Sequence, residues 1–91
     1  MQIEFDPGKD ETNRRKHDVS FQAASEFDWK SAFEREDDRF DYGEDRFVAI
    51  GQIGYKLYVM VFTEGSHENA VRVISLRLAE KHEVRFYYDQ V

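Results

Sequence analysis

The sequence predicts a small α+β protein in which an antiparallel β-sheet packs against two N-terminal helices and one C-terminal helix. Residues 55–63 (YKLYVMVFT) carry apolar side chains at both odd and even positions, which is typical of a central strand covered on both faces. Segments with helix caps or helical apolar spacing lie before and after the predicted run of strands over residues 46–76. The 91 residues fit one domain, 1–91, without an internal repeat or a linker.

The chain is expected to begin with a short strand over residues 2–5 and a helix over residues 7–17. Asp6 can cap the first free amides of that helix, and Pro7 suits its first turn, where the missing N–H costs nothing. Nearly all residues of this helix are polar, so we expect it to lie on the surface. Its last turn carries four cationic side chains, which compensate the helix dipole or bind an anion.

A second helix is expected to begin at Ser20, a typical capping residue. Its apolar residues recur at a spacing of three and form one stripe over two turns: Phe21, Ala24 and Phe27. An edge strand over 30–36 and a charged loop over 37–44 are expected to follow.

The second half of the chain reads as a meander of strands and a final helix. The strands are expected over 46–50, 55–63 and 70–76, with turns at 51–54 and 65–69, and the helix over 79–88. On the strand over 55–63 we expect Leu57, Val59 and Val61 on one face and Tyr58, Met60 and Phe62 on the other.

The composition excludes several classes of protein. The absence of cysteine excludes a disulfide framework and thiolate metal sites, and the three histidines have no spacing typical of metal ligands. Residues 1–10 lack the apolar run of a signal peptide, and the longest apolar stretch, 57–62, is too short to cross a bilayer. We therefore expect a cytoplasmic protein with no membrane contact, no metal and no cofactor.

The net charge of −6 argues at first sight against a nucleic-acid partner. Residues 31–45 hold seven acidic and two basic residues, however, and the rest of the chain has a net charge of only −1. A basic surface outside this segment is therefore compatible with the composition, since local fields steer a polyanion. The acidic segment itself would either repel RNA or contact basic residues of another protein.

Two arginines stand in or just after an otherwise apolar strand. Arg72 and Arg77 must each face solvent, a carboxylate or a bound anion. Their positions differ by an odd number, so a straight strand sends them to opposite faces, and they converge only if the strand ends or bulges near Ser75. With Arg46 and Lys56 at the starts of their own strands, such a sheet face could hold RNA, and the alternative is a solvated face.

The chain resembles the BrnT family of bacterial ribonuclease toxins in an ordered series of short motifs. The series is FDPGK at 5–9, Asn13, KHDVSF at 16–21, EDRF at 44–47 with Ile50-Gly51, VFTE at 61–64, and RVISLR at 72–77 followed by Ala79, Glu83 and Tyr87. These pieces cover nearly the whole chain. Two departures are Gly65-Ser66-His67, where many members carry another arginine, and Leu76 in place of the common alanine.

The resemblance implies a RelE-like α+β fold and a type II toxin that cleaves RNA. It also implies neutralisation by a BrnA-type antitoxin protein, which carries the DNA-binding portion and represses the shared promoter together with the toxin. The toxin itself would contact DNA only indirectly. A second class of function is a non-catalytic module that binds the antitoxin and acts in transcriptional autoregulation.

RNA can be cleaved without metal when the 2′-hydroxyl attacks the adjacent phosphate, a base takes its proton and cations stabilise the transition state. Resemblance and chemistry together assign the cationic role to Arg72, Arg77 and Arg46. For proton transfer we expect His17 or Glu44, of which His17 has the better intrinsic pKa. The expected RNA-binding residues are Lys9, Lys16, Lys56 and Tyr87, although Tyr87 could instead close the core.

Overall fold

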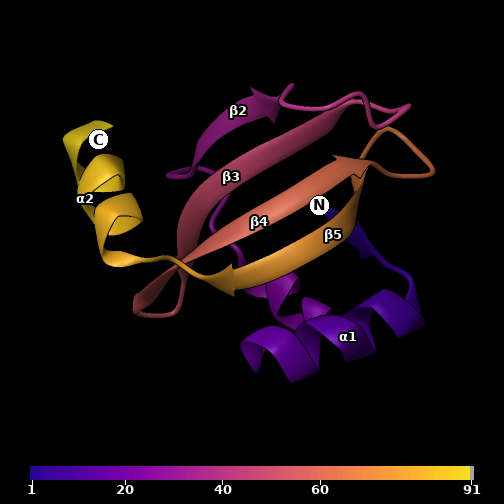
Figure 1. The fold of residues 1–91 in the computed structure, drawn as a ribbon, viewed down its shortest axis with the longest axis horizontal. Coiled ribbons are helices and arrows are strands. Elements are labelled where there is room, and N and C mark those ends of the chain that lie inside the picture. The colour runs from indigo at the N-terminus through magenta and orange to yellow at the C-terminus, as the bar shows by residue number, and fades with distance from the viewer. Residues whose placement is uncertain (91) are drawn as a thin grey trace.

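The computed structural model describes residues 1–90 and confirms the α+β class (Figure 1). Its elements are β1 (Gln2–Glu4), α1 (Pro7–His17), the 3₁₀ helix η1 (Phe21–Glu26), β2 (Phe33–Asp37), β3 (Arg46–Ile53), β4 (Lys56–Glu64), β5 (Ala70–Leu78) and α2 (Lys81–Gln90). The five strands form one sheet in the order β1-β5-β4-β3-β2. The central position of β4 agrees with its two apolar faces.

The sheet is not antiparallel throughout, which corrects the prediction. Strand β1 pairs in parallel with β5, with Gln2 opposite Ala70 and Glu4 opposite Arg72, whereas the other three pairings are antiparallel. Such a parallel pair requires a long connection, and here the whole intervening chain supplies it. Ser66 in the β4–β5 turn reinforces the pairing, because its N–H donates to Glu4 Oε1 at 2.9 Å.

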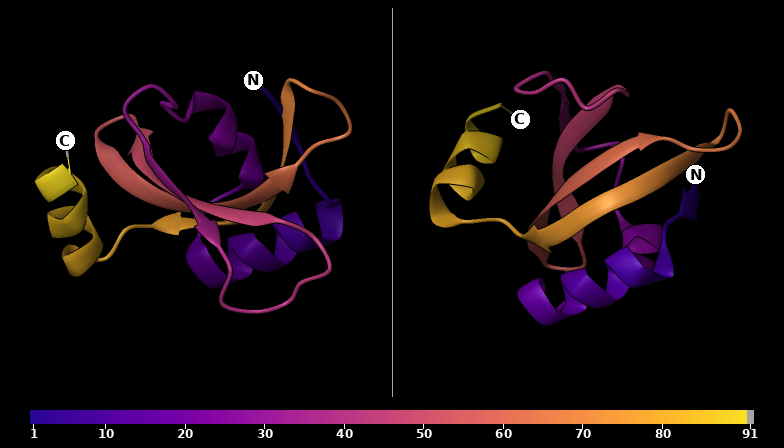
Figure 2. Two further views of the ribbon diagram at one scale, coloured as in Figure 1. Left: turned by 90° about the horizontal axis from the view of Figure 1, so that it is seen from above. Right: turned by 45° about the vertical axis from the view of Figure 1, so that its right-hand side comes forward.

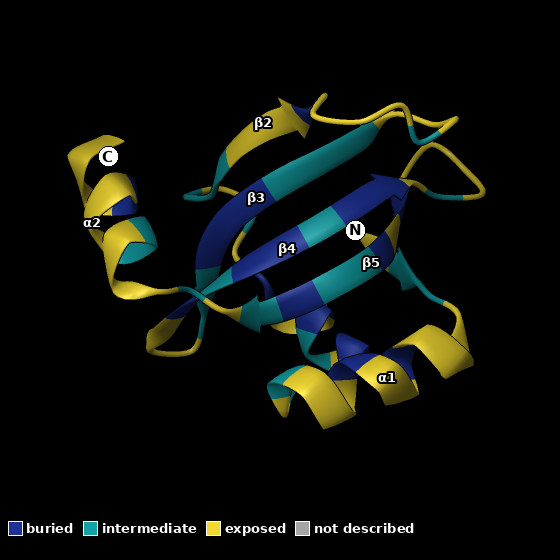
Figure 3. Cartoon of the chain, viewed as in Figure 1, coloured by how far each residue is buried: buried dark blue, intermediate teal, exposed yellow. Residues whose placement is uncertain are grey.

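The sheet separates two apolar clusters. One face packs against η1, where Phe21, Met60 and Leu76 are among the buried residues. The other face packs in part against α2, through Val59 and Tyr87. Figure 2 shows α1 and α2 on different sides of the sheet, and Figure 3 shows the buried middle of β3 and β4 between exposed outer elements. The predicted alternation along β4 is thus confirmed.

Both N-terminal caps are confirmed. The Asp6 side chain accepts from the Gly8 N–H at 3.0 Å, and the Ser20 hydroxyl accepts from the Gln22 N–H at 3.2 Å. Helix α1 ends at His17 and is capped by Asp18, whose backbone adopts the left-handed conformation with φ 57°. The second helix, however, is a six-residue 3₁₀ segment rather than an α-helix, and its apolar side chains still face the sheet.

The turn expected at 51–54 is shorter in the structure, because β3 continues to Ile53. Gly51 lies inside the strand, where the ring of Phe27 occupies the place of a side chain: a Cβ atom on Gly51 would lie 2.5 Å from Phe27 Cζ. The turn needs only Gly54, which adopts φ 62°, and its neighbour Tyr55. Strand β5 likewise runs two residues beyond its expected end, so α2 begins at Lys81.

No helix within residues 1–90 is long and apolar enough to cross a membrane.

Candidate functional site

Helix α1 packs against the sheet through polar side chains. The Asn13 side chain is 5% exposed and bonds both backbone groups of Leu76 on β5, and Asp10 accepts from the Phe21 N–H at 2.7 Å. The helix lies on the surface as predicted, but its side chains of Asn13 and Asp10 are buried, which the polar sequence of the helix did not indicate. These bonds hold α1 beside β5 where β1 no longer pairs with that strand.

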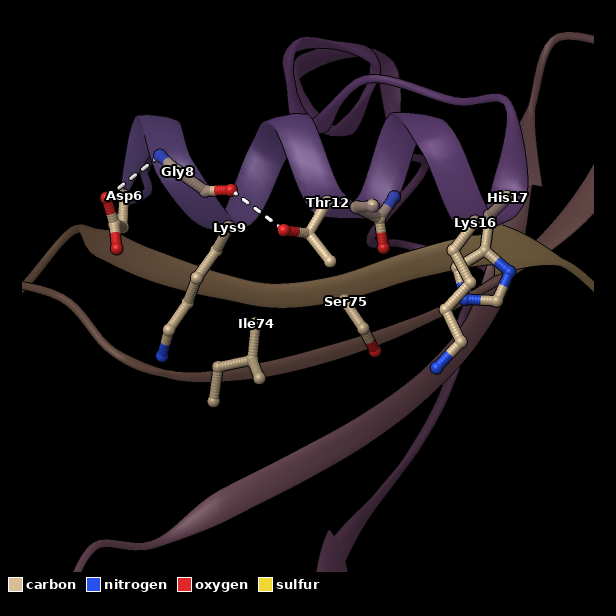
Figure 4. A pocket seen from close by; sticks show the side chains of 9 residues that line it. Asp6, Gly8, Lys9, Thr12, Lys16, His17, Ile74 and Ser75 are labelled. Atoms are coloured by element: carbon tan, nitrogen blue, oxygen red, sulfur yellow. Dashed lines mark hydrogen bonds between the residues drawn. The ribbon is translucent and has the colours of Figure 1, made fainter.

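A cleft of about 350 Å³ lies along this contact between α1 and β5 (Figure 4). Its lining residues are Asp6, Gly8, Lys9, Thr12, Asn13, Lys16, His17, Ile74 and Ser75. In Figure 4 the side chains of Lys9 and Lys16 extend past the strand on the side where Ser75 points. Within residues 1–90 neither lysine forms an ion pair, so both charges remain available to an anion.

A bulge in β5 brings the two strand arginines onto one face of the sheet. Val61 of β4 pairs with Ser75 and the next residue, Phe62, pairs with Val73, so Ile74 is the extra residue. Arg72 is therefore opposite Thr63, and Arg77 opposite Val59. These two β4 positions are four residues apart and share the face that α2 covers in part. The sequence analysis predicted that Arg72 and Arg77 converge only if the strand ends or bulges near Ser75, and the structure contains such a bulge.

The guanidinium of Arg77 is held by a carboxylate from α2. Its Nη1 and Nη2 donate to the two oxygens of Glu83 at 2.7 and 2.8 Å, and Nη1 also donates to the Leu78 carbonyl at 3.2 Å. The hydrogen bonds from Arg77 lower the pKa of Glu83, and in turn the pKa of Arg77 is raised. The sequence had assigned no role to Glu83, although the residue stood in the resembling motif.

His17, at the last turn of α1, is half-buried at one end of the cleft. Burial lowers its pKa, and the positive charges of Lys16 and Arg77 lower it further. Two predicted site residues from distant parts of the chain, His17 and Arg77, therefore lie close enough to affect each other. The lowered pKa keeps the imidazole neutral near pH 7, which is the form that accepts a proton.

Arg46 and Arg72 lie on the same sheet face, toward the opposite end from α2. Arg46 of β3 lies opposite Asp37 of β2 in the strand register, and its guanidinium carbon lies 4.0 Å from the centroid of the Tyr42 ring. Its Nε is buried and has no hydrogen-bond partner within residues 1–90. Arg72 is exposed, near the carboxylate of Glu4, whose pKa it helps to lower. Neither arginine lines the cleft beside α1.

Three expected residues lie apart from the cleft. Glu44 is exposed in the acidic loop between β2 and β3, and Lys56 is exposed at the start of β4. Tyr87 is 3% exposed, and its hydroxyl donates to the Ser31 carbonyl at 2.7 Å. This burial contradicts the RNA-binding assignment of Tyr87, because no ring face is open to a base. Its other predicted role, closing the core, agrees with the structure.

Comparison with known proteins defines the class: the chain is similar to ribonuclease toxins of type II toxin–antitoxin systems. The family described as "Ribonuclease toxin, BrnT, of type II toxin-antitoxin system" matches residues 5–83, and the chain belongs to this BrnT family. The 1.1 Å crystal structure of the Brucella abortus ribonuclease toxin BrnT is similar, with 31% identity and a TM-score of 0.70 over 89% of this chain and 99% of that chain. No curated protein matches the chain.

Proposed function

We propose that this BrnT-family toxin is a metal-independent endoribonuclease that acts in the cytoplasm and inhibits translation and growth. The observation that carries the proposal is that His17 and Lys16 line one cleft beside β5, within electrostatic reach of Arg77 on that strand. This arrangement combines a neutral imidazole with fixed cations, which are the two requirements for cleavage by the 2′-hydroxyl. Membership of a type II family supplies the antitoxin partner, and we propose that this partner is of the BrnA type and alone contacts DNA.

In the proposed reaction His17 acts as the general base. It takes the proton of the 2′-hydroxyl, the 2′-oxygen bonds to phosphorus, and the bond from phosphorus to the 5′-oxygen breaks. The 5′-oxygen takes a proton from water, and the resulting hydroxide takes the proton from His17, which restores the neutral imidazole. The products are a 2′,3′-cyclic phosphate end and a 5′-hydroxyl end. Because the pKa of His17 is lowered, the imidazole is in its proton-accepting form at neutral pH.

Arg77 supplies the fixed positive charge for the phosphorane-like transition state. Its bonds to Glu83 and Leu78 use three of the five guanidinium N–H groups, and Nε–H and one Nη2–H remain for phosphate oxygens. The carboxylate holds the side chain in one orientation, so its charge needs no reorganisation during the reaction. Lys9 and Lys16 guide the RNA backbone, and Arg72 and Arg46 extend the cationic face beyond the cleft.

The test is cleavage of naked total RNA in EDTA by the antitoxin-free protein. Wild type is expected to produce 2′,3′-cyclic phosphate ends, and Arg77→Ala and His17→Gln are each expected to lose at least 100-fold in rate. Arg15→Ala is the matched control, because Arg15 lies on α1 outside the cleft and forms an ion pair with Glu11 on the surface. Full activity of both site variants would overturn the assigned roles.

A second candidate function is a non-catalytic module that binds the antitoxin and acts in autoregulation of transcription. The net charge of −6 and the engagement of Arg77 by Glu83 favour it. Induction of the toxin without its antitoxin separates the two functions. A nuclease arrests growth, and this arrest is relieved in Arg77→Ala, whereas a binding module leaves growth unchanged.

A further inference from the structure

A second hollow of about 410 Å³ lies on the face that carries Arg77, between α2 and the strands β2, β3 and β4. We call it the α2 groove. Apolar side chains of β3 and β4 form its floor, and its walls are formed by Phe33 and Arg35 from β2 and by His82, Glu83 and Phe86 from α2. The groove therefore combines aromatic and cationic side chains, and it shares Glu83 with the Arg77 site.

Two phenylalanines form the aromatic wall of the α2 groove. The rings of Phe33 and Phe86 meet edge to face, with centroids 5.0 Å apart and an interplanar angle of 84°. Phe86 remains 41% exposed even though it packs against Phe33. An exposed ring at the mouth of a hollow offers a surface on which a flat ligand can stack.

One in-register row of residues joins the α2 groove to the cleft beside α1, and a second row joins the groove to Arg77. One row runs across β5, β4, β3 and β2 through Ser75, Val61, Val48 and Arg35, and the other through Arg77, Val59, Ile50 and Phe33. Each row crosses three strand intervals, or about 14 Å at the usual spacing. Ser75 lines the cleft and Arg35 lines the groove, so one sheet face links the two hollows.

We propose that the α2 groove binds an unstacked nucleobase of single-stranded RNA, one or two nucleotides from the phosphate held between His17 and Arg77. This inference rests on the proposed ribonuclease function and adds the subsite that recognises the substrate. The base stacks on Phe86, and the cationic side chain of Arg35 contacts the neighbouring phosphate. RNA modules commonly combine an aromatic stacking platform with cations in this way.

The chemistry of the groove favours a nucleotide over an apolar segment of another protein. Arg35 is exposed and forms no ion pair within residues 1–90, and His82 adds a second basic group at the wall. A purely apolar ligand would bring no charge to Arg35. A nucleotide brings a flat ring for Phe86 and an anion for Arg35 together.

The test measures binding of a labelled single-stranded RNA made non-cleavable by 2′-O-methyl groups, with one abasic residue placed at each position in turn. For wild type we expect one position at which loss of the base weakens binding about tenfold or more. Phe86→Ala is expected to weaken binding of the intact RNA similarly and to abolish the penalty at that position. Phe86→Leu preserves apolar volume without an aromatic ring, and it is expected to behave in the same way if Phe86→Ala does not fold.

The matched control is Tyr88→Ala, which removes an exposed aromatic ring from the same helix outside the groove. This variant is expected to retain both the affinity and the abasic penalty of wild type. Three results overturn the proposal: no position shows a penalty, the penalty persists in Phe86→Ala and Phe86→Leu, or these variants weaken only the binding of the antitoxin. Failure of the ribonuclease proposal is read separately, from cleavage of unmodified RNA by wild type.

Discussion

The side chain of Asn13 pairs with the backbone of Leu76 as a neighbouring strand would. Its Nδ2 donates to the Leu76 carbonyl at 2.8 Å, and its Oδ1 accepts from the Leu76 N–H at 3.2 Å. The same Nδ2 also donates to the Val19 carbonyl at 3.0 Å. One amide therefore closes the open edge of β5 beyond β1 and places α1, with Lys16 and His17, beside the strand that carries Arg77.

Replacement of Asn13 by alanine is expected to lower the free energy of unfolding by about 2–3 kcal/mol, because buried backbone groups of Leu76 lose their partners. Urea denaturation measures the loss. Thr12→Ala is the control on the same helix, since Thr12 is exposed and its hydroxyl donates to the Gly8 carbonyl one turn away. It is expected to change stability by less than about 0.5 kcal/mol. Equal stability of Asn13→Ala and wild type would contradict the edge-closing role.

Gly51→Ala is expected to destabilise the protein by about 1–3 kcal/mol, because the new methyl group overlaps the Phe27 ring in the core. Gly8→Ala provides the comparison: a Cβ there has its nearest neighbour at 3.6 Å, and alanine favours the helix. The midpoint of thermal unfolding is expected to fall in Gly51→Ala. In Gly8→Ala the midpoint is expected to rise or to stay unchanged. A stable Gly51→Ala would mean that Phe27 repacks without cost.

The cleavage rate is expected to rise with pH on the acidic side with a midpoint below 6.5, because the general base His17 has a pKa below that value. The measurement is kcat/KM on a short RNA between pH 4.5 and 8. His17→Gln is expected to lose this limb along with most of its activity, and His82→Gln is expected to keep it. If the residual activity of His17→Gln still rose with pH at the same midpoint, the titrating group would not be His17.

Asp37 is expected to stabilise the fold at neutral pH and to lose this contribution in acid. Hydrogen bonds from Arg39, aided by Tyr42, lower the pKa of its carboxyl from 3.8 to about 2. The unfolded chain therefore binds the proton first, and the stabilisation disappears as the pH falls from about 4 to about 2. Asp37→Asn is expected to cost about 1–3 kcal/mol at pH 7, and this difference should shrink across that window in urea titrations.

The control for the Asp37 prediction is Asp38→Asn, which replaces an exposed carboxylate at the adjacent position. It is expected to leave the pH dependence of unfolding nearly unchanged. A constant stability difference between Asp37→Asn and wild type from pH 7 to pH 2 would contradict the lowered pKa of Asp37.

Glu83 is expected to act as a positioning residue through Arg77. Glu83→Gln should reduce kcat about tenfold, less than the loss of at least 100-fold in Arg77→Ala, and the double variant should be no slower than Arg77→Ala alone. Glu80→Gln is the control, because Glu80 is mostly exposed and its carboxylate lies 3.9 Å from Arg77 Nη1. Additive losses in the double variant would show that Glu83 acts independently of Arg77.

Local signals predicted much of the fold. The bounds of α1 agree with the prediction because its caps, Asp6-Pro7 and the turn at Asp18, are made by residues adjacent in sequence. The two faces of β4 were predicted from alternation alone. The parallel pairing of β1 and the 3₁₀ form of η1 were not predicted, because each depends on partners far along the chain.

For the candidate site, too, the sequence predicted some features correctly and others not. The residue types His17, Lys16, Lys9 and Arg77 were chosen from chemistry and resemblance, and the structure places all four at or beside one cleft. Glu44, Lys56 and Tyr87 were also chosen, and the structure places them elsewhere. A list of suitable side chains contains no information on which of them face each other across strands.

The amino-acid sequence by itself determined the α+β class, the capped polar helix and the central strand, because these follow from local periodicity and capping. Its charges, together with the family resemblance, supplied the cationic candidates for the site. Only the tertiary structure decided that Arg72 and Arg77 share a face and that Glu83 holds Arg77. Those outcomes depend on a one-residue bulge at Ile74 and on the docking of α2. A shift of one residue in strand register reverses the face of every side chain that follows, and the pairing partner that sets the register is not a neighbour in sequence.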